Sequence, residues 1–111
     1  MKPSALLSIA IALVFAAPAL EASMPTNAPA DVGAGKKRAA TCFACHGEDG
    51  VSKIPGTPHL AGQDRIYLEK SLRAYRDGSR NDPAMTAMAK PLSDADIANI
   101  AAYFAQARRR S

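Results

Sequence analysis

The sequence predicts an all-α fold, with three principal helices joined by irregular loops. No segment alternates apolar and polar residues with a period of two over a useful length, so strands are not expected. Two segments, one from about residue 64 to 77 and one from residue 93 onwards, instead carry apolar residues at helical spacing. Glycine and proline collect between such segments, most densely at residues 47–62. With 111 residues and no internal repeat, the chain has room for one small domain.

The beginning of the chain is expected to be a secretory signal peptide. A short basic start is followed by thirteen predominantly apolar residues, Ala5 to Ala17, and small residues near Ala19 and Ala22 then offer cleavage sites. The apolar run is too short to span a bilayer comfortably, although a retained membrane anchor is the alternative. Cleavage would leave a periplasmic protein with no integral membrane segment. The expected divisions are a signal peptide at 1–22, a flexible leader at 23–30 and the domain at 31–111.

The composition indicates that side chains alone do not fill the core. Removing residues 1–22 leaves 89, of which only 12 are Leu, Ile, Val or Phe, and this share lies below the roughly 20% at which disorder becomes a fair suspicion. The helix signals are nevertheless well formed, so a large apolar cofactor is expected to complete the core. The formal net charge of +4 is mildly basic, and no interleaving of aromatic and basic residues suggests nucleic-acid binding.

The first helix is expected to begin after Asp31, a good N-cap, and to continue towards Cys42. Gly33 and Gly35 lie inside it, and each costs about 1 kcal/mol of helix stability relative to alanine. Glycines at these positions suggest that another element crosses close to the backbone. A loosely formed first turn is the alternative.

The second helix is expected from about Asp64 to Asp77, with Gly78 as the stop just beyond its end. Its apolar positions are Ile66, Leu68, Leu72 and Tyr75. After a polar loop, Asn81-Asp82-Pro83 favours a turn into a short helix that carries Met85 and Met88.

The last helix has the best-marked start in the chain. Ser93 is its expected N-cap, acidic residues follow in the first turn, and Leu92 can pack onto Ile97 as a hydrophobic staple. Its apolar face comprises Ile97, Ile100, Ala101 and Phe104. The basic run Arg108-Arg109-Arg110 is expected to close the helix at its negative end.

The sequence Cys42-Phe43-Ala44-Cys45-His46 has the spacing typical of covalent haem attachment. Each thiol can add across a haem vinyl group, and the histidine that follows can bind the iron from the same side. A disulfide would need a thioredoxin-like context, which is absent. A zinc site would need a fourth ligand such as His59, at a spacing that matches no common pattern. Chance occurrence is the remaining alternative.

A low-spin electron carrier also needs a second axial iron ligand, and a thioether in that position raises the reduction potential. The candidates after His46 are Met85, Met88 and His59. The two methionines lie one helical turn apart, so only one of them can bind. His59 is expected to be an exposed loop residue.

The chain resembles a class I c-type cytochrome of the bacterial periplasmic kind, and in particular one half of the two-haem members of that group. The resemblance extends from about Asp31 to Ala107 and implies the cytochrome c fold wrapped around one covalently bound haem c. The residues that carry it, besides Cys42 to Gly47, are Gly35-Lys36, Asp49-Gly50, Pro58-His59-Leu60-Ala61-Gly62-Gln63, Tyr67-Leu68, Asn81-Asp82-Pro83-Ala84-Met85, Leu92-Ser93-Asp94-Ala95-Asp96-Ile97 and Ala101-Ala102-Tyr103-Phe104.

The resemblance also implies roles for single residues. By position, Met85 matches the sixth ligand of the iron, and Met88 matches a companion methionine that packs nearby. Pro58 matches the proline whose carbonyl accepts the Nδ1–H of His46 and so orients it. Gly35 matches the crossing point of the first and last helices, with Tyr103 or Phe104 packed against it. The connection from Gly78 to Met85 is short for the family, which would leave the haem edge more open there.

The function expected from these features is one-electron transfer, with the haem iron cycling between ferric and ferrous. Two axial side chains leave no open position on the iron, so enzyme activity is not expected. Redox partner proteins would dock at the exposed haem edge, with Lys36, Lys37 and Lys53 steering an acidic partner. The alternatives are a subunit of a periplasmic dehydrogenase or reductase complex, and a ligand-binding sensor or catalytic haem in which neither methionine binds.

Overall fold

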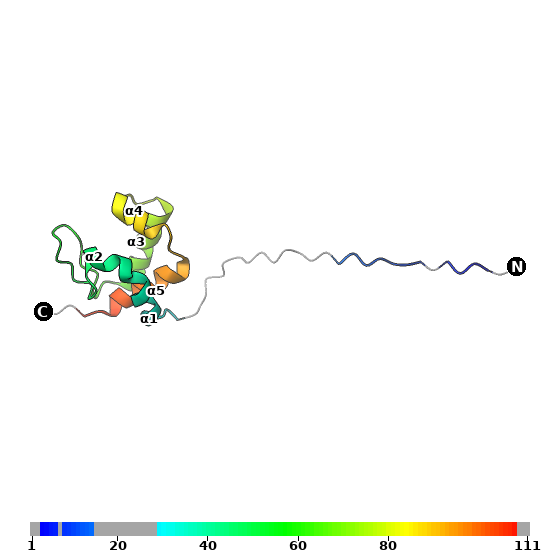
Figure 1. Ribbon diagram of the computed structural model, residues 1–111, viewed down its shortest axis with the longest axis horizontal. Helices are drawn as coiled ribbons and strands as arrows, with labels where there is room; N and C mark the ends of the chain where they lie inside the picture. The colour runs from blue at the N-terminus through cyan, green and yellow to red at the C-terminus, as the bar shows by residue number, and fades with distance from the viewer. Residues whose placement is uncertain (1–2, 7, 15–28, 109–111) are drawn as a thin grey trace.

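In the computed structural model, which describes residues 3–6, 8–14 and 29–108, helices form the domain and the described residues contain no strand (Figure 1). The predicted all-α class is therefore confirmed. The predicted cleavage region around Ala19 and Ala22 lies outside the described residues. Within the described part of the chain, no helix is both long and apolar enough to cross a membrane. The elements are α1 (Val32–Arg38), the 3₁₀ helix η1 (Ala39–Cys42), α2 (Phe43–His46), α3 (Arg65–Asp77), α4 (Pro83–Ala89) and α5 (Asp94–Gln106).

The first and last helices cross at Gly35, as the resemblance implies. A Cβ built on Gly35 would overlap the backbone carbonyl oxygen of Asn99, lie 2.5 Å from its carbonyl carbon, and lie 3.1 Å from Cβ of Tyr103. The Asn99 side chain also accepts a hydrogen bond from the backbone N–H of Asp31, at 2.8 Å. Gly35 therefore permits backbone contact between α1 and α5, so the predicted crossing is confirmed there and a loosely formed first turn does not explain this glycine. At Gly33 the prediction is wrong, because a Cβ there would meet only the Asp31 side chain.

The start and end of α3 follow the sequence signals. The Asp64 side chain caps the helix by accepting from the Tyr67 N–H at 2.8 Å, and Gly78 ends it in the left-handed region with φ +88°. Leu68 is buried and Leu72 packs against the core. Ile66 is 56% exposed, so its place on the predicted apolar face is wrong. It lies about 160° around the helix from Leu68 at 100° per residue.

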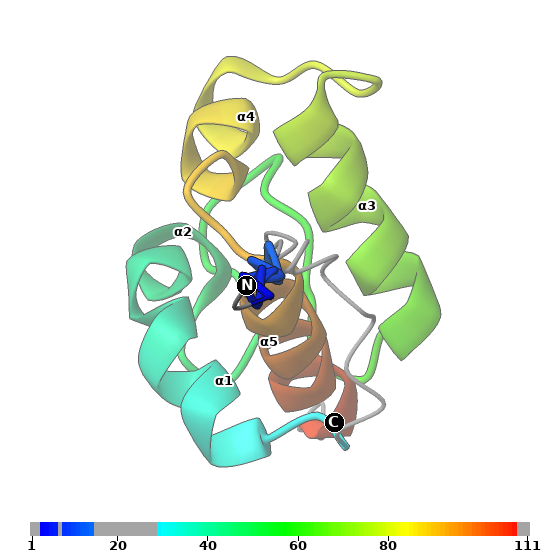
Figure 2. The same ribbon diagram turned by 90° about the vertical axis from the view of Figure 1, so that its right-hand side faces the viewer.

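The short helix α4 begins with Asp82, whose side chain accepts from the Met85 N–H at 2.9 Å. Pro83 occupies the first turn, where its missing N–H costs nothing. Figure 2 shows α4 at one end of the domain, with α5 running between the α1–α2 arm and α3. Both predicted methionines therefore lie on an element that packs at the end of the bundle.

A capping box starts α5: the Ser93 hydroxyl accepts from the Asp96 N–H at 3.0 Å, while the Asp96 carboxylate accepts from the Ser93 N–H at 3.0 Å. The helix ends at Gln106, because Ala107 turns to an extended conformation. The Phe104 carbonyl accepts hydrogen bonds from the N–H of Ala107, at 3.2 Å, and from the N–H of Gly62 in the distant loop, at 3.0 Å. The prediction that Arg108 closes the helix is therefore wrong, and Arg109 and Arg110 lie outside the described residues.

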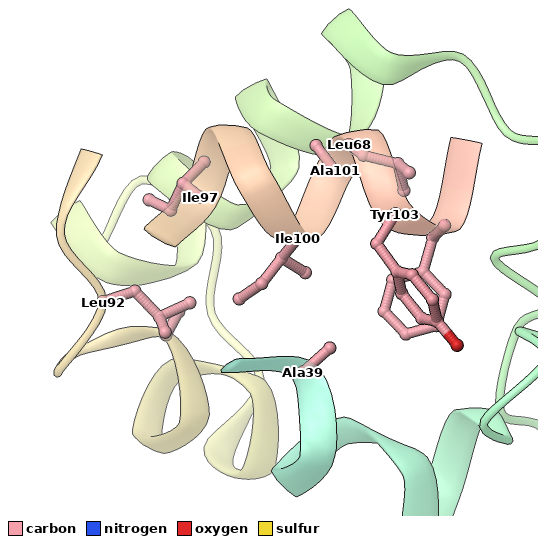
Figure 3. Packing of buried hydrophobic residues seen from close by; sticks show 9 residues of the cluster. Ala39, Leu68, Leu92, Ile97, Ile100, Ala101 and Tyr103 are labelled. Carbon is pink, nitrogen blue, oxygen red and sulfur yellow. The ribbon is translucent and has the colours of Figure 1, made fainter. Parts of the chain in front are cut away.

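The core is a small cluster built around the inner face of α5 (Figure 3). Phe104 and Ile97 are the largest fully buried side chains in the described chain. Leu92 and Ile97 are both buried there, as the predicted staple requires. Because the sequence has few large apolar residues, part of this core consists of alanine side chains. The buried apolar residues are Ala39, Leu68, Ala89, Leu92, Ile97, Ile100, Ala101, Tyr103 and Phe104.

We expect the capping box to contribute pH-dependent stability. Burial opposes ionisation of Asp96, but hydrogen bonds from Ser93 and from Arg38 outweigh it and hold the pKa of Asp96 below its ordinary value of 3.8. Stability from the ionised group is therefore complete above that value and is lost as the pH falls through the lower, folded pKa. Asp96→Asn should lower the free energy of unfolding by about 0.5–1 kcal/mol at pH 7.

Urea unfolding of the wild type and the variant at pH 7 and at pH 2.5 checks this expectation. The difference between the two proteins should shrink at pH 2.5, because the stability from ionised Asp96 is lost as the pH falls below 3.8 towards and through its lowered, folded pKa. An equal difference at both pH values would contradict the assigned role of the charge.

Candidate functional site

The two cysteines lie on one continuous helical path from η1 into α2. Cys42 is half-buried and Cys45 is exposed, and both are free thiols. Burial raises the pKa of Cys42 above its ordinary value, partly offset by a hydrogen bond with Thr41 and by the Arg38 charge. The disulfide alternative is therefore not supported, and both sulfur atoms are available for covalent chemistry.

His46 ends α2 and is held in one orientation. Its side chain is buried, and its Nδ1 lies 2.9 Å from the carbonyl oxygen of Pro58. A carbonyl oxygen only accepts hydrogen bonds, so Nδ1 carries the proton and Nε2 carries the free lone pair. This is the tautomer that a metal-binding imidazole needs at Nε2.

The loop that delivers Pro58 is folded by its own backbone. Leu60 and Ala61 both donate from their N–H groups to the Gly50 carbonyl, at 2.8 and 3.0 Å. A Cβ on Gly50 would lie 2.7 Å from the Ala61 nitrogen, and Gly50 also has φ +75°. Only glycine therefore allows this close pairing of the two ends of the loop.

Ser52 joins the loop to the cysteine motif, a contact that sequence reasoning missed. Its hydroxyl donates to the Cys45 carbonyl at 2.9 Å, and its backbone N–H donates to Nδ1 of His59 at 2.8 Å. His59 is exposed and serves as a loop residue. No group of three or more His, Cys, Asp and Glu side chains in the described chain could hold a metal ion, so the zinc alternative is not supported. A serine in an aperiodic loop offers no sequence signal for such a contact.

The two methionines differ in their environment. Met85 is half-buried, whereas Met88 is 46% exposed. Both belong to α4, which lies above α2 in Figures 1 and 2. The methionines and His46 thus come from different elements, separated by α3 in the chain.

The residues present fit a covalently bound haem. Two free thiols, an imidazole with an available Nε2 and a half-buried thioether form the donor set of a haem c. Leu60, Leu72 and Tyr75 are only partly buried against the core, and an apolar macrocycle would complete their burial. A separate open depression of about 570 Å³ lies on another side of the motif: Cys45 and Lys53 line it, whereas His46, Met85 and the partly buried Leu60, Leu72 and Tyr75 do not.

Aromatic packing supports the motif from the side of α5. Phe43, between the two cysteines, lies with its ring centroid 6.0 Å from Tyr103 and 6.4 Å from Phe104. The Tyr103 hydroxyl donates to the Glu48 carbonyl, which ties α5 to the start of the loop. Burial raises the pKa of Tyr103, so it stays a neutral donor over the physiological range.

Comparison with known proteins gives consistent matches. The family model for cytochrome c matches residues 32–108. The chain is 53% identical over 77 residues to cytochrome c-554(548) of Halomonas halodenitrificans, covering 67% of this chain and 93% of that protein. It is 49% identical over 79 residues to cytochrome c4 of Pseudomonas aeruginosa, covering 71% of this chain and 39% of that protein.

Two further matches extend the comparison. A thiosulfate dehydrogenase electron acceptor from Thiomonas intermedia is 44% identical over 80 residues, covering 71% of this chain and 37% of that protein. The crystal structure of reduced recombinant cytochrome c4 from Pseudomonas stutzeri superposes with a TM-score of 0.67 at 43% identity, covering 71% of this chain and 46% of that one. The chain therefore spans less than half the length of these longer relatives. It belongs to the cytochrome c family and is an electron-transferring c-type cytochrome with one covalently bound haem c and its iron.

Proposed function

We propose that this cytochrome is a periplasmic one-electron carrier whose iron is bound axially by His46 and Met85. The observation that carries the proposal is the 2.9 Å contact between Nδ1 of His46 and the Pro58 carbonyl, because it leaves Nε2 ready to bind a metal. When bound, haem c supplies an iron that changes between ferric and ferrous. The protein supplies the attachment, the ligands and the surroundings of that iron.

Cys42 and Cys45 are the proposed attachment points. Each thiol would add across one vinyl group of the haem, forming a carbon–sulfur bond while the thiol proton passes to the other vinyl carbon. The helical path from η1 to α2 places both sulfur atoms and His46 within five consecutive residues. Pro58 fixes the imidazole ring and increases its donor strength through the hydrogen bond to Nδ1.

Met85 is the proposed sixth ligand, since it is half-buried whereas Met88 is 46% exposed. The Asp82 side chain holds the Met85 N–H at 2.9 Å, so the backbone that carries the thioether is fixed. A thioether stabilises the ferrous state and raises the potential. With both axial positions taken by side chains, the proposed role is electron transfer without substrate turnover.

Residues 1–22 are the proposed export signal, with cleavage near Ala19 or Ala22. Export would deliver the domain at residues 31–111 to the periplasm, where soluble redox partners can reach it. Cys45 is exposed beside the open depression, and Lys53 lines the same depression. The Nζ atom of Lys36 lies 3.4 Å from Oε1 of Glu48, so the positive charge of Lys36 is partly balanced by this carboxylate. Lys53 is therefore the stronger candidate for steering an acidic redox partner to this face.

A second candidate function is that of the cytochrome partner of a periplasmic dehydrogenase or reductase complex. The observation that favours it is the similarity to the thiosulfate dehydrogenase electron acceptor of Thiomonas intermedia. Stable co-purification with an oxidoreductase from native periplasm would support this role, whereas a protein that elutes alone supports the freely diffusing carrier.

Absorption spectroscopy of two variants tests the ligand assignment. We expect Met85→Ala to lose the ferric methionine–iron charge-transfer band, to bind external ligands and to fall in reduction potential, because the iron loses its thioether. Met88→Ala, one helical turn away, is the matched control and should keep the band. Loss of the band in Met88→Ala with retention in Met85→Ala would reverse the assignment.

A further inference from the structure

One arginine joins the end of α3 to the segment between α4 and α5. The Nη1 group of Arg76 donates to the Leu92 carbonyl oxygen at 3.3 Å and to Oδ1 of Asp94 at 2.7 Å. Its Nε group donates to Oδ1 of Asp77 at 2.9 Å, and this third contact orients the guanidinium plane. The hydrogen bond from Arg76 lowers the pKa of Asp94 below its ordinary value of 3.8, so the pair is charged at neutral pH.

The carbonyl group that Arg76 contacts belongs to the segment that follows α4. Leu92 is buried, and its N–H donates to the Ala89 carbonyl at 3.0 Å. Ala89 is the last residue of α4, and its side chain is fully buried in the core. Figure 2 shows this segment leading from α4 to the start of α5. Leu92 therefore connects the end of α4 to Arg76, with its N–H bonded to the helix and its carbonyl bonded to the guanidinium.

Met85 lies on the face of α4 that these contacts hold. It precedes Ala89 by four residues, so the two side chains are about 40° apart around the helix. Met85 is half-buried, whereas the residues before it in α4 are exposed. With seven residues, α4 is too short to be stable by itself. Its position therefore depends on its packing against α3 and on the contacts that hold its end.

We propose that Arg76 is a positioning residue for the sixth ligand of the iron, because it holds the end of α4 and thereby keeps the Met85 thioether in place. The inference rests on the proposed ligation of the iron by Met85. Without Arg76, the Leu92 carbonyl and the Asp94 carboxylate lose the group that joins both of them to α3. The end of α4 then opens more often, and the thioether leaves with it.

The experiment uses the ferric mature holoprotein with Arg76→Ala and Arg76→Lys, together with two controls. Arg73→Ala removes another arginine of α3, which makes its ion pair with Glu69 of the same helix at 4.0 Å. Asp31→Ala removes the hydrogen bond of 3.0 Å that caps α1, so it lowers overall stability at a helix other than α4.

Three measurements report different properties of these variants. Imidazole binding to the iron, followed by loss of the methionine charge-transfer band, reaches a limiting rate that equals the rate at which Met85 leaves. Hydrogen exchange of the Lys90 and Leu92 amides reports opening at the end of α4, since these amides donate to Thr86 and Ala89. Urea unfolding reports the overall stability.

Arg76→Ala should raise the limiting imidazole rate about tenfold, because hydrogen bonds to charged groups no longer oppose the opening. The Lys90 and Leu92 amides should exchange faster by a similar factor. Arg76→Lys should reverse part of both changes, since an ammonium group can bind one of the two acceptors but lacks the planar fork. Arg73→Ala and Asp31→Ala should change the imidazole rate by less than about twofold.

An imidazole rate in Arg76→Ala within twofold of the wild type would overturn the inference and leave Arg76 as a contact that only adds stability. An equal rise in Asp31→Ala would also overturn it, because the rate would then follow overall stability. The absorption spectrum separates these outcomes from failure of the proposed function. If the wild type shows the charge-transfer band and Met85→Ala lacks it, the ligation stands and the imidazole rates decide the role of Arg76. If Met85→Ala keeps the band, the ligand assignment fails and the inference fails with it.

Discussion

Replacing Gly35 by alanine is expected to destabilise the holoprotein more than any other single-methyl addition along α1. The new Cβ would overlap the Asn99 carbonyl oxygen and lie 2.5 Å from its carbonyl carbon. Both contacts are with backbone, so no side-chain rotation can relieve them, and α1 must move away from α5. We expect a loss of about 3 kcal/mol, which corresponds to a fall of about 12–24 °C in Tm for a domain of this size.

Gly33→Ala is the matched control, because it adds the same methyl group to the same helix. Its Cβ would meet only the Asp31 side chain, with Oδ1 at 3.3 Å. Replacing glycine inside a helix gains up to about 1 kcal/mol, so this variant should be as stable as the wild type or more stable. Thermal unfolding followed by circular dichroism compares the two variants. Similar Tm values for both would refute the close crossing.

The double variant Cys42→Ala/Cys45→Ala should lose covalent haem completely. Both thiols are free, and they are the two cysteines of the sequence, so no other sulfur atom can replace them. Haem staining after denaturing electrophoresis should be absent from the double variant. We further expect loss of cooperative unfolding, because the core has few large apolar side chains and a chain of this size buries little surface by itself.

Ala44→Ser serves as the control, since it changes the exposed spacer residue and keeps both thiols. It should retain haem on the denaturing gel and unfold cooperatively. Haem that stays attached in the double variant would show that other residues form the covalent link. Cooperative melting without haem would instead show that the side chains suffice for the core.

Helix starts are the part of the fold that the sequence predicts best. Asp31 and Ser93 are predicted as N-caps, and each accepts the expected backbone hydrogen bond. Asp64, predicted only as the approximate start of its helix, caps it in the same way. The reason is that a cap is a local interaction, completed within three residues of chain. The stop at Gly78 was predicted for the same reason, since a left-handed residue needs only its own backbone.

The features that the sequence misplaced depend on distant neighbours. Ile66 has the spacing of an apolar face, yet the packing of α3 leaves it exposed. Arg108 suits the end of a helix, yet α5 ends earlier, where the Phe104 carbonyl bonds with Gly62 from the far loop. The contact of Ser52 with Cys45 arises in an aperiodic loop. None of these contacts has a period or a short-range pattern from which it could be derived.

The sequence by itself determined the helical class, the family resemblance and the five-residue motif from Cys42 to His46, because these rest on local spacing and chemistry. Only the tertiary structure decided which atoms meet. It places the Pro58 carbonyl at His46 and the Asn99 backbone at Gly35. These contacts join positions 12 and 64 residues apart, and both form only when the loops and helices have packed.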